Sequence, residues 1–282
     1  MRSVPCAIGT FTKRPVETQY VSEPDPEGFG NDPNPTQPPA TWSSLSKNWL
    51  RSRFHFNFAE WQQGPPTFGV MRVMNDDLVQ PNRMFGLHPH REMEIATYVV
   101  EGSLSHFHRD VKGGTASETL GAGSVQFMSA GLGITHSEGN DSNIPVRFIQ
   151  IWILPRKQGV TPNYGSVQGD TRTALRTNQW DHLVGDVEDT TSTAPAKIHQ
   201  DCNIFVADQT PDAVTPLTFT VKPGRQAYVL VITGPVSIST SATNGEILHT
   251  YESGATKGPA TLVFSQQQAK TNLLIVEMAA TA

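Results

Sequence analysis

Short apolar runs, each bounded by glycine, proline or polar residues, recur along most of the chain. In the first half they lie at 68–74, 95–104, 125–128 and 146–154, preceded by phenylalanines at 54, 56 and 58 that alternate with polar residues. In the second half they lie at 203–207, 217–221, 227–233, 236–239, 261–265 and 272–278. Runs of this kind are typical of β-strands, and no convincing amphipathic helix of three turns is evident. The sequence therefore predicts an all-β protein with a β-barrel or sandwich in each half.

Two polar stretches interrupt this pattern. Residues 23–41 are rich in proline, glycine and asparagine, which sustain neither helix nor strand, and predict an exposed arm or insertion. Residues 156–198 are polar and irregular and are interpreted as a crossover between two domains. The expected organisation is an N-terminal arm over 1–41, an N-terminal domain over 42–160, and the crossover with a C-terminal domain over 161–282.

Composition narrows the partners that the chain can have. Its 282 residues include 21 Lys and Arg against 26 Asp and Glu, a formal net charge of -5, and no basic cluster of the kind that phosphate binding needs. Nucleic acid is therefore not expected as a direct partner. Cys6 and Cys202 are the two cysteines, too few and too far apart for a disulfide framework, which favours a reducing compartment. No apolar run approaches the ~20 residues of a membrane span, so we expect a cytoplasmic protein, nuclear or organellar if the source is eukaryotic.

The segment 86–94 concentrates side chains that can bind a metal ion. It reads Gly-Leu-His-Pro-His-Arg-Glu-Met-Glu, and residues two apart in a strand share a face. His88, His90 and Glu94 would then point the same way. His136 and Glu138 share a face by the same rule, and a neighbouring strand could place them opposite the first group. Three imidazoles and a carboxylate suit Fe, Mn, Co, Ni, Cu or Zn and do not suit Ca or Mg.

A second His-x-His pair, His106 and His108, has no comparable partner beside it in the sequence. It runs into Arg109 and Asp110, so we interpret it as a solvated strand end that takes no part in metal binding.

Several stretches together resemble the pirin family of the cupin superfamily, most closely its bacterial branch of quercetinases. They are the His-Pro-His-x-x-x-Glu pattern at 88–94, Thr-Tyr-Val-Val-Glu-Gly at 97–102, the segment 128–138 that ends in His-Ser-Glu, and the flanking segments 72–77 and 150–155. The resemblance is specific from about 49 to 164 and weaker beyond, where 198–201 is the best match.

Two departures from that branch stand out. The branch has Trp-His-x-Phe where this chain has Arg53–Phe54–His55–Phe56, so no role is carried over to His55. The proline-rich stretch before Trp49 has no counterpart in the branch.

The resemblance implies two cupin domains, of which only the N-terminal one binds metal, and it selects between the two carboxylates. Many cupins use the acid that follows the first histidine pair, here Glu94. Pirins place it two residues after the third histidine, so the implied ligands are His88, His90, His136 and Glu138, with Glu94 as the alternative. We expect one divalent transition metal per chain, Fe(II) first, with Ni, Cu, Mn, Co and Zn as alternatives.

The expected function follows from charge and from the resemblance. A divalent ion with three neutral imidazoles and one carboxylate has a net charge of about +1 and favours an oxygen anion such as an enolate or phenolate. The resemblance implies a quercetin 2,3-dioxygenase-type oxidoreductase that opens a flavonol with dioxygen, with Glu138 as ligand and base. The alternative is a non-enzymatic, metal- and redox-dependent interaction protein with a protein partner, one that modulates transcription factors.

The C-terminal half lacks these ligands. When Gly234 is aligned with Gly102, the positions of His88, His90 and Glu94 become Thr220, Lys222 and Gln226, and an ammonium group has no lone pair for a metal. We therefore expect the second domain to be a degenerate copy without a metal.

Overall fold

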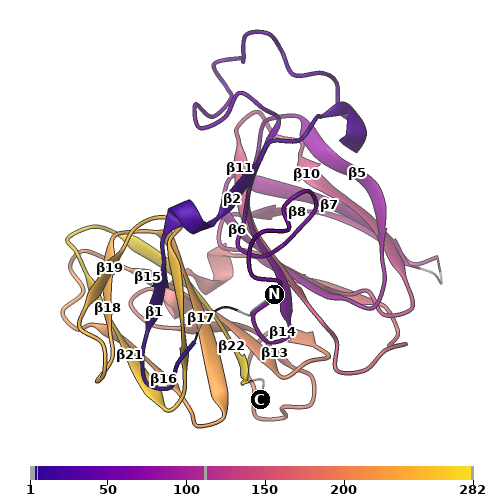
Figure 1. Cartoon of the computed structure of the whole chain (residues 1–282). Helices are drawn as coiled ribbons and strands as arrows, with labels where there is room; N and C mark the ends of the chain where they lie inside the picture. The colour runs from indigo at the N-terminus through magenta and orange to yellow at the C-terminus, as the bar shows by residue number, and fades with distance from the viewer. Residues whose placement is uncertain (1–3, 5, 111–112, 281–282) are drawn as a thin grey trace.

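The computed structural model describes residues 4, 6–110 and 113–280 and contains two β-domains (Figure 1). Each domain pairs a seven-stranded sheet with a four-stranded sheet. Helical structure in the described residues is limited to short segments: the 3-10 turns η1 (Val16–Thr18), η2 (Glu27–Phe29) and η3 (Asp170–Arg172) and the α-helix α1 (Thr173–Arg176). The predicted all-β architecture with two domains is confirmed.

The N-terminal domain is antiparallel throughout. Its seven-stranded sheet has the order β12-β9-β6-β11-β4-β3-β2 and its four-stranded sheet the order β5-β10-β7-β8. The strands of the larger sheet are β2 (Tyr20–Ser22), β3 (Leu50–Phe54), β4 (Met71–Val79), β6 (Glu94–Glu101), β9 (Val125–Ser129), β11 (Val146–Ile153) and β12 (Asn163–Val167). Those of the smaller sheet are β5 (Arg83–His90), β7 (Ser103–Asp110), β8 (Thr115–Gly121) and β10 (Ile134–Asn140).

The C-terminal domain repeats this plan. Its sheets have the orders β1-β20-β17-β22-β15-β13-β14 and β16-β21-β18-β19. The strands of the larger sheet are β1 (Thr12–Arg14), β13 (Asp181–Asp186), β14 (Ala196–Ile198), β15 (Cys202–Gln209), β17 (Arg225–Thr233), β20 (Ser253–Lys257) and β22 (Thr271–Ala279). Those of the smaller sheet are β16 (Leu217–Val221), β18 (Val236–Ser239), β19 (Glu246–Leu248) and β21 (Ala260–Gln266).

The two larger sheets pack against each other through one apolar core. Ile149 and Ile151 of β11 lie in this core together with Leu230 and Ile232 of β17. Val229 and Val231 of the same strand face the opposite way and pack in the interior of the C-terminal domain. Strands buried on both faces read as continuous apolar runs, which explains the unbroken run at 227–232.

The N-terminus of the chain joins the two domains. β1 pairs with β20, with Thr12 opposite Ala255, whereas β2 pairs with β3 in the other domain. In Figure 1 the indigo strand β1 therefore lies among the strands of the C-terminal domain. Nothing local in the sequence indicates a partner that lies some 240 residues away.

The stretch 156–198 contains three strands, although its sequence shows no strand pattern. β12 pairs with β9 at the edge of the N-terminal sheet, and β13 and β14 pair with each other in parallel at the edge of the C-terminal sheet. β12 and β14 are short edge strands, which need no apolar run. β13 lies between β14 and β15 and is largely buried, so its place in the sheet depends on neighbours that no local pattern reveals. The alternation at 54–58 also ends early, because β3 stops at Phe54.

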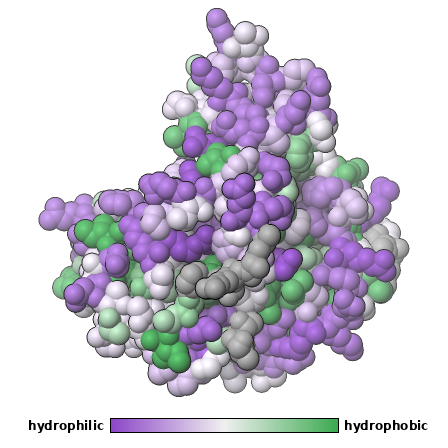
Figure 2. All heavy atoms as spheres, in the orientation of Figure 1, coloured by the Kyte–Doolittle hydropathy of each residue, from purple (hydrophilic) through white to green (hydrophobic). Residues whose placement is uncertain are grey.

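The surface is mixed in character. The face in Figure 2 is mainly hydrophilic, with hydrophobic residues scattered singly or in small groups, as is ordinary for a folded domain. No helix in the described part of the chain is long and apolar enough to cross a membrane.

Candidate metal centre and adjoining cavity

Three histidines converge inside the N-terminal domain. His88 and His90 alternate with Pro89 on β5, and His136 lies opposite His88 on the neighbouring strand β10. Each of the three offers a ring nitrogen, and these nitrogens all lie within 4.8 Å of one another. The arrangement follows from the two-residue period of a strand, which turns both β5 imidazoles to one face.

The hydrogen bonds around these rings leave lone pairs that face each other. His88 Nδ1 lies 2.8 Å from the carbonyl oxygen of Gly86, which makes Nδ1 the donor. His136 Nδ1 lies 3.2 Å from His106 Nε2, so an Nδ1–H of His136 can donate there. The Nε2 atoms of His88 and His136 then face each other at 2.9 Å as acceptors. Two lone pairs at this separation repel each other unless a cation lies between them, so the donor set fits a metal ion.

Burial lowers the pKa of two of these rings, His90 and His136, and keeps both in the form that binds metal. It lowers the pKa of His90 to about 4, with a smaller contribution from His88. It lowers the pKa of His136 further, and the neighbouring histidines add to the effect. A metal binds neutral imidazole, so no proton has to be removed from His90 or His136 at neutral pH.

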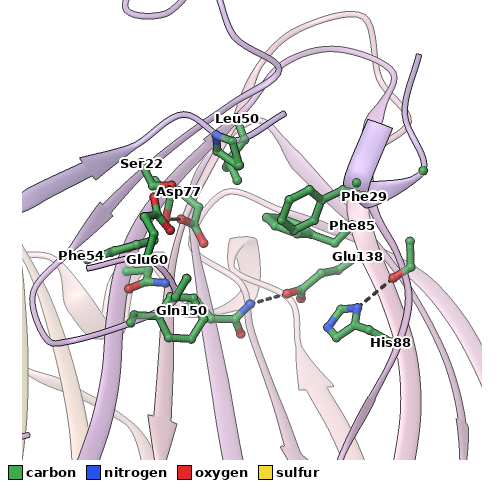
Figure 3. Close-up of a pocket in the computed structure, with 18 of the residues that line it drawn as sticks. Ser22, Phe29, Leu50, Phe54, Glu60, Asp77, Phe85, His88, Glu138 and Gln150 are labelled. Atoms are coloured by element: carbon green, nitrogen blue, oxygen red, sulfur yellow. Dashed lines mark hydrogen bonds between the residues drawn. The ribbon is translucent and has the colours of Figure 1, made fainter. Parts of the chain in front are cut away.

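Glu138 is buried next to this group and is held by two amides. Its Oε1 accepts a hydrogen bond from Gln150 Nε2, and its Oε2 accepts one from Gln126 Nε2 at 3.1 Å. Burial raises the pKa of the carboxyl to about 7, against the opposing effect of the two amides. Figure 3 shows Glu138 and His88 beside each other at one side of the cavity, with Gln150 reaching the carboxylate.

Glu94 lies in the larger sheet, whereas His88 and His90 lie in the smaller one, and it is not part of the histidine group. β5 ends at His90, the chain turns through Glu92 at φ 51°, and β6 begins at Glu94. The shared parity expected for Glu94 is therefore wrong, because parity does not continue through a turn. Ser129 Oγ donates to Glu94 Oε2 at 2.6 Å, and the backbone of His199 also bonds the carboxylate.

The pair His106 and His108 is buried, so the interpretation as a solvated strand end is wrong. The two side chains are 2% and 7% exposed. Their strand β7 pairs with β10, which places His108 opposite His136 and His106 opposite Glu138. Tyr164 of β12 covers both rings, with centroids 4.5 Å from His106 and 4.3 Å from His108.

A cavity of about 590 Å³ adjoins the histidines and has both His88 and Glu138 in its wall. This volume lies within the range of small-molecule sites. Aromatic side chains from several segments line it: Phe29, Phe54, Phe58, Phe85 and Trp152. The proline-rich stretch supplies part of the wall through Pro24, Gly28, Phe29 and Gly30.

The C-terminal domain holds no comparable group in the residues that the structure describes. Its barrel is filled by apolar side chains such as Val229, Val231 and Phe264. Thr220 and Lys222 are exposed, and Gln226 donates to the carbonyl oxygen of Ala279. His55 of the first domain is also outside the centre: it is fully buried where the domains meet, with Nδ1 3.0 Å from Tyr228 Oη.

Several residues of the site had no role in the sequence analysis. Asn75, Asp77 and Gln150 occur in the segments that carry the family resemblance, and they line the cavity. Thr97 and Gln126 face the same interior, where Gln126 donates to Thr97 Oγ1. Polar residues inside strands that otherwise read as core are the signal that could have identified them.

Comparison with known proteins finds family matches in both domains. The family model described as Pirin matches residues 39–153, and the model described as Quercetinase C-terminal cupin domain matches residues 189–278. The quercetin 2,3-dioxygenase of Escherichia coli K12 is 35% identical over 195 residues, which are 68% of this chain and 78% of that protein. A relative from Zymomonas mobilis is 45% identical over 119 residues, which span 42% of this chain and 49% of its own length.

Solved structures give the same result. A bacterial pirin from Escherichia coli, crystallised in complex with nickel(II), superimposes with a TM-score of 0.69 at 27% sequence identity. The match covers 93% of this chain and 100% of that one.

Proposed function

Because this chain belongs to the pirin family of the cupin superfamily, we propose that it is a metal-dependent dioxygenase that opens flavonols, an oxidoreductase of the quercetin 2,3-dioxygenase type. The observation that carries the proposal is the cavity of about 590 Å³ that has both His88 and Glu138 in its wall. A flat polyphenol fits between its aromatic side chains with an oxygen at the histidines. The name of the Escherichia coli relative supports the same chemistry.

The proposed ligands are His88, His90, His136 and Glu138, and they hold one divalent transition metal per chain. Fe(II) is our first choice, and the nickel complex of the related pirin supports Ni as well. Cu, Mn, Co and Zn also suit the donor set. When bound, the ion supplies Lewis acidity and, if redox-active, a centre for dioxygen chemistry.

Glu138 acts as the base that takes the proton of the flavonol 3-hydroxyl. Gln150 and Gln126 each occupy one lone pair of the carboxylate and hold it in position, which leaves one lone pair for the metal and one for the proton. A pKa of about 7 before the ion binds suits a base near neutral pH. A bound cation would lower the pKa of the Glu138 carboxyl and the pKa of the substrate hydroxyl together, so the carboxylate would still be able to take the proton.

The surrounding side chains orient the reacting groups and keep water out. His106 accepts from His136 and fixes the direction in which its Nε2 points. The aromatic walls restrict the substrate to a flat pose and leave few hydrogen-bonding groups for solvent near the deprotonated oxygen.

The test is Glu138→Gln, which keeps the size of the side chain and one oxygen but removes the basic site. We expect a substantial fraction of the metal to remain and flavonol turnover to fall by roughly 100-fold or more, the usual range for a positioned base. Metal content and the decay of flavonol absorbance are measured on the same preparation.

Glu94→Gln is the matched control and is expected to keep turnover, because its carboxylate faces Ser129 and His199. Loss of turnover in Glu94→Gln with normal turnover in Glu138→Gln would transfer both roles to Glu94. If the wild-type protein consumes no flavonol with any of the metals, the non-enzymatic interaction protein becomes the better hypothesis.

A further inference from the structure

The end of the cavity opposite the histidines is polar, and its residues form a cross-strand row. Ser22 of β2 lies opposite Ser52 of β3, and Ser52 lies opposite Asp77 of β4. All three line the cavity, as does Glu60 from the loop after β3. In Figure 3 Ser22, Glu60 and Asp77 lie on one side of the cavity, and Glu138 and His88 lie across from them.

This end offers acceptors at Glu60 and Asn75, and a group at Asp77 that can also donate, because burial raises the pKa of the Asp77 carboxyl to about 8. The Ser52 hydroxyl donates to Asp77 Oδ1, and the Ser22 hydroxyl donates to Glu60 Oε1 at 2.5 Å. The protons of both serine hydroxyls are therefore already engaged in hydrogen bonds within the cavity wall. Each carboxyl group still has a second oxygen. A hydroxyl on a ligand fits here, because it can donate to Glu60 or Asn75 and can also accept the proton of Asp77.

Asn75 provides an independent indication of a ligand. Its side chain is 4% exposed and lines the cavity, and its Oδ1 has no hydrogen-bond partner in the described structure. On β4, Asn75 lies between two cross-strand neighbours, Phe54 of β3 and Gln150 of β11. A buried acceptor without a partner is destabilising, and a donor on a bound molecule would satisfy it.

Aromatic rings enclose the space between the two polar ends. Phe54 and Phe58 meet edge to face, with centroids 5.1 Å apart, and Phe29 and Phe85 do so at 5.8 Å. Both pairs line the cavity. A flat ring system held between them would place one edge at the histidines and the other at Asn75 and the carboxylates.

We propose that Asn75, Asp77 and Glu60 form a second subsite that binds phenolic hydroxyls on the substrate ring farthest from the histidines. The subsite selects rings with adjacent hydroxyls over unsubstituted rings, since its polar groups stay without a hydrogen-bond partner against the latter. This inference rests on the proposed function for the substrate class, a flavonol. It adds which ring of the flavonol the protein recognises.

The test compares two flavonols in binding, without turnover. Quercetin has two adjacent hydroxyls on its distal ring, and galangin has the same oxygens on its other rings but lacks those two. Dissociation constants are measured by fluorescence quenching on the protein loaded with Zn²⁺, which is redox-inert, in the absence of dioxygen. We expect the wild-type protein to prefer quercetin by about tenfold, the range of one or two added hydrogen bonds.

The variant Asn75→Leu keeps the approximate size of the side chain and removes the acceptor. We expect it to reduce the preference to about twofold or less, through weaker quercetin binding. Glu60→Gln, at an exposed position, gives a second measurement if Asn75→Leu folds poorly, and its preference should fall by a smaller factor. Phe58→Leu is the control: it removes apolar contact and should weaken both flavonols by a similar factor.

The outcomes separate the two proposals. A wild-type preference near one, or a preference that both Asn75→Leu and Glu60→Gln leave unchanged, overturns the subsite. If the preference for quercetin is unchanged in both variants, its cause is chelation of the metal by the adjacent hydroxyls. A preference that falls in the variants, without any flavonol consumption by the metal-loaded protein in air, supports the subsite and contradicts the dioxygenase. Failure to bind either flavonol contradicts both.

Discussion

At the scale of single residues, the proposed metal centre would depend on side chains that are not themselves ligands. The ring of His136 is fixed by His106, and the ring of His106 is stacked on Tyr164 with an interplanar angle of 9°. Outer partners of this kind orient a ligand ring and select its tautomer. We therefore propose a positioning role for His106, which its sequence context did not reveal.

We predict that His106→Ala weakens metal binding about 10- to 100-fold while His88→Ala removes most of the metal. The first variant loses the partner that orients His136, and the second loses a ligand. Metal titration of each purified variant measures the difference. His182→Ala serves as the control, since His182 bonds Asn203 in the C-terminal domain. Wild-type affinity in His106→Ala would contradict the positioning role.

His55 makes a second prediction at this scale, one that concerns pH. Burial, together with the charges of Arg14 and Arg53, holds the pKa of His55 well below its usual value. Below about pH 6.5 the unfolded chain gains a proton that the folded chain does not, so the free energy of unfolding falls as the pH falls. The loss from this residue is up to about 1.4 kcal/mol for each pH unit.

Denaturant unfolding of the metal-free protein at neutral pH and near pH 5 measures this effect. We expect His55→Asn to lose less stability on acidification than the wild-type protein, and the exposed control His249→Asn to behave like the wild type. Equal pH dependence in all three proteins would show that His55 is protonated in the folded state.

At the scale of elements, the proline-rich stretch is a wall of the cavity. Asn31 bonds the backbone of Met84 in both directions, at 2.8 and 2.9 Å. Trp49 Nε1 donates to the carbonyl oxygen of Pro24 at 3.0 Å. The stretch is thereby fastened to β5 and to the start of β3, and the ring of Phe29 on η2 packs against Trp49 with centroids 5.1 Å apart.

We predict that Phe29→Ala weakens flavonol binding about tenfold, because it removes one aromatic wall of the cavity. Phe29 is 37% exposed, so the fold should tolerate the change. Binding is measured by fluorescence quenching, with Gln37→Ala as a control in an exposed part of the same stretch that does not line the cavity. Unchanged affinity in Phe29→Ala would mean that the substrate does not reach this wall.

At the scale of the whole molecule, the two domains share one strand plan but differ in the polarity of their interiors. The N-terminal barrel carries polar side chains such as Thr97, Gln126 and Gln150 on the strands that face its histidines. The C-terminal barrel is filled with aliphatic and aromatic side chains. A polar interior needs a ligand or a hydrogen-bond network to offset its burial, whereas an apolar interior supplies stability by itself.

We predict one transition-metal ion per chain. Elemental analysis of the wild-type protein should give about one equivalent, and His136→Ala should give a small fraction of it. Lys222→His, on the exposed strand end of the second domain, should leave the stoichiometry unchanged, since a single imidazole there has no partners. Two equivalents per chain, retained in His136→Ala, would contradict the prediction.

The sequence by itself predicted the strands that read as apolar runs and the three histidines that the structure brings together. Both depend on local information: a two-residue period assigns faces, and the placement of His88 and His90 on one face needs no knowledge of the rest of the chain. The family resemblance added the pirin architecture and the choice of Glu138 over Glu94.

Only the tertiary structure decided which faces are covered and by what. The turn at Glu92 separates Glu94 from the strand that carries His88 and His90. Tyr164, on a strand whose sequence has no apolar pattern, covers the rings of His106 and His108. The proline-rich stretch became a cavity wall, and β1 joined the sheet of the second domain. Each of these depends on contacts between segments far apart in the chain, whose free energy no local pattern records.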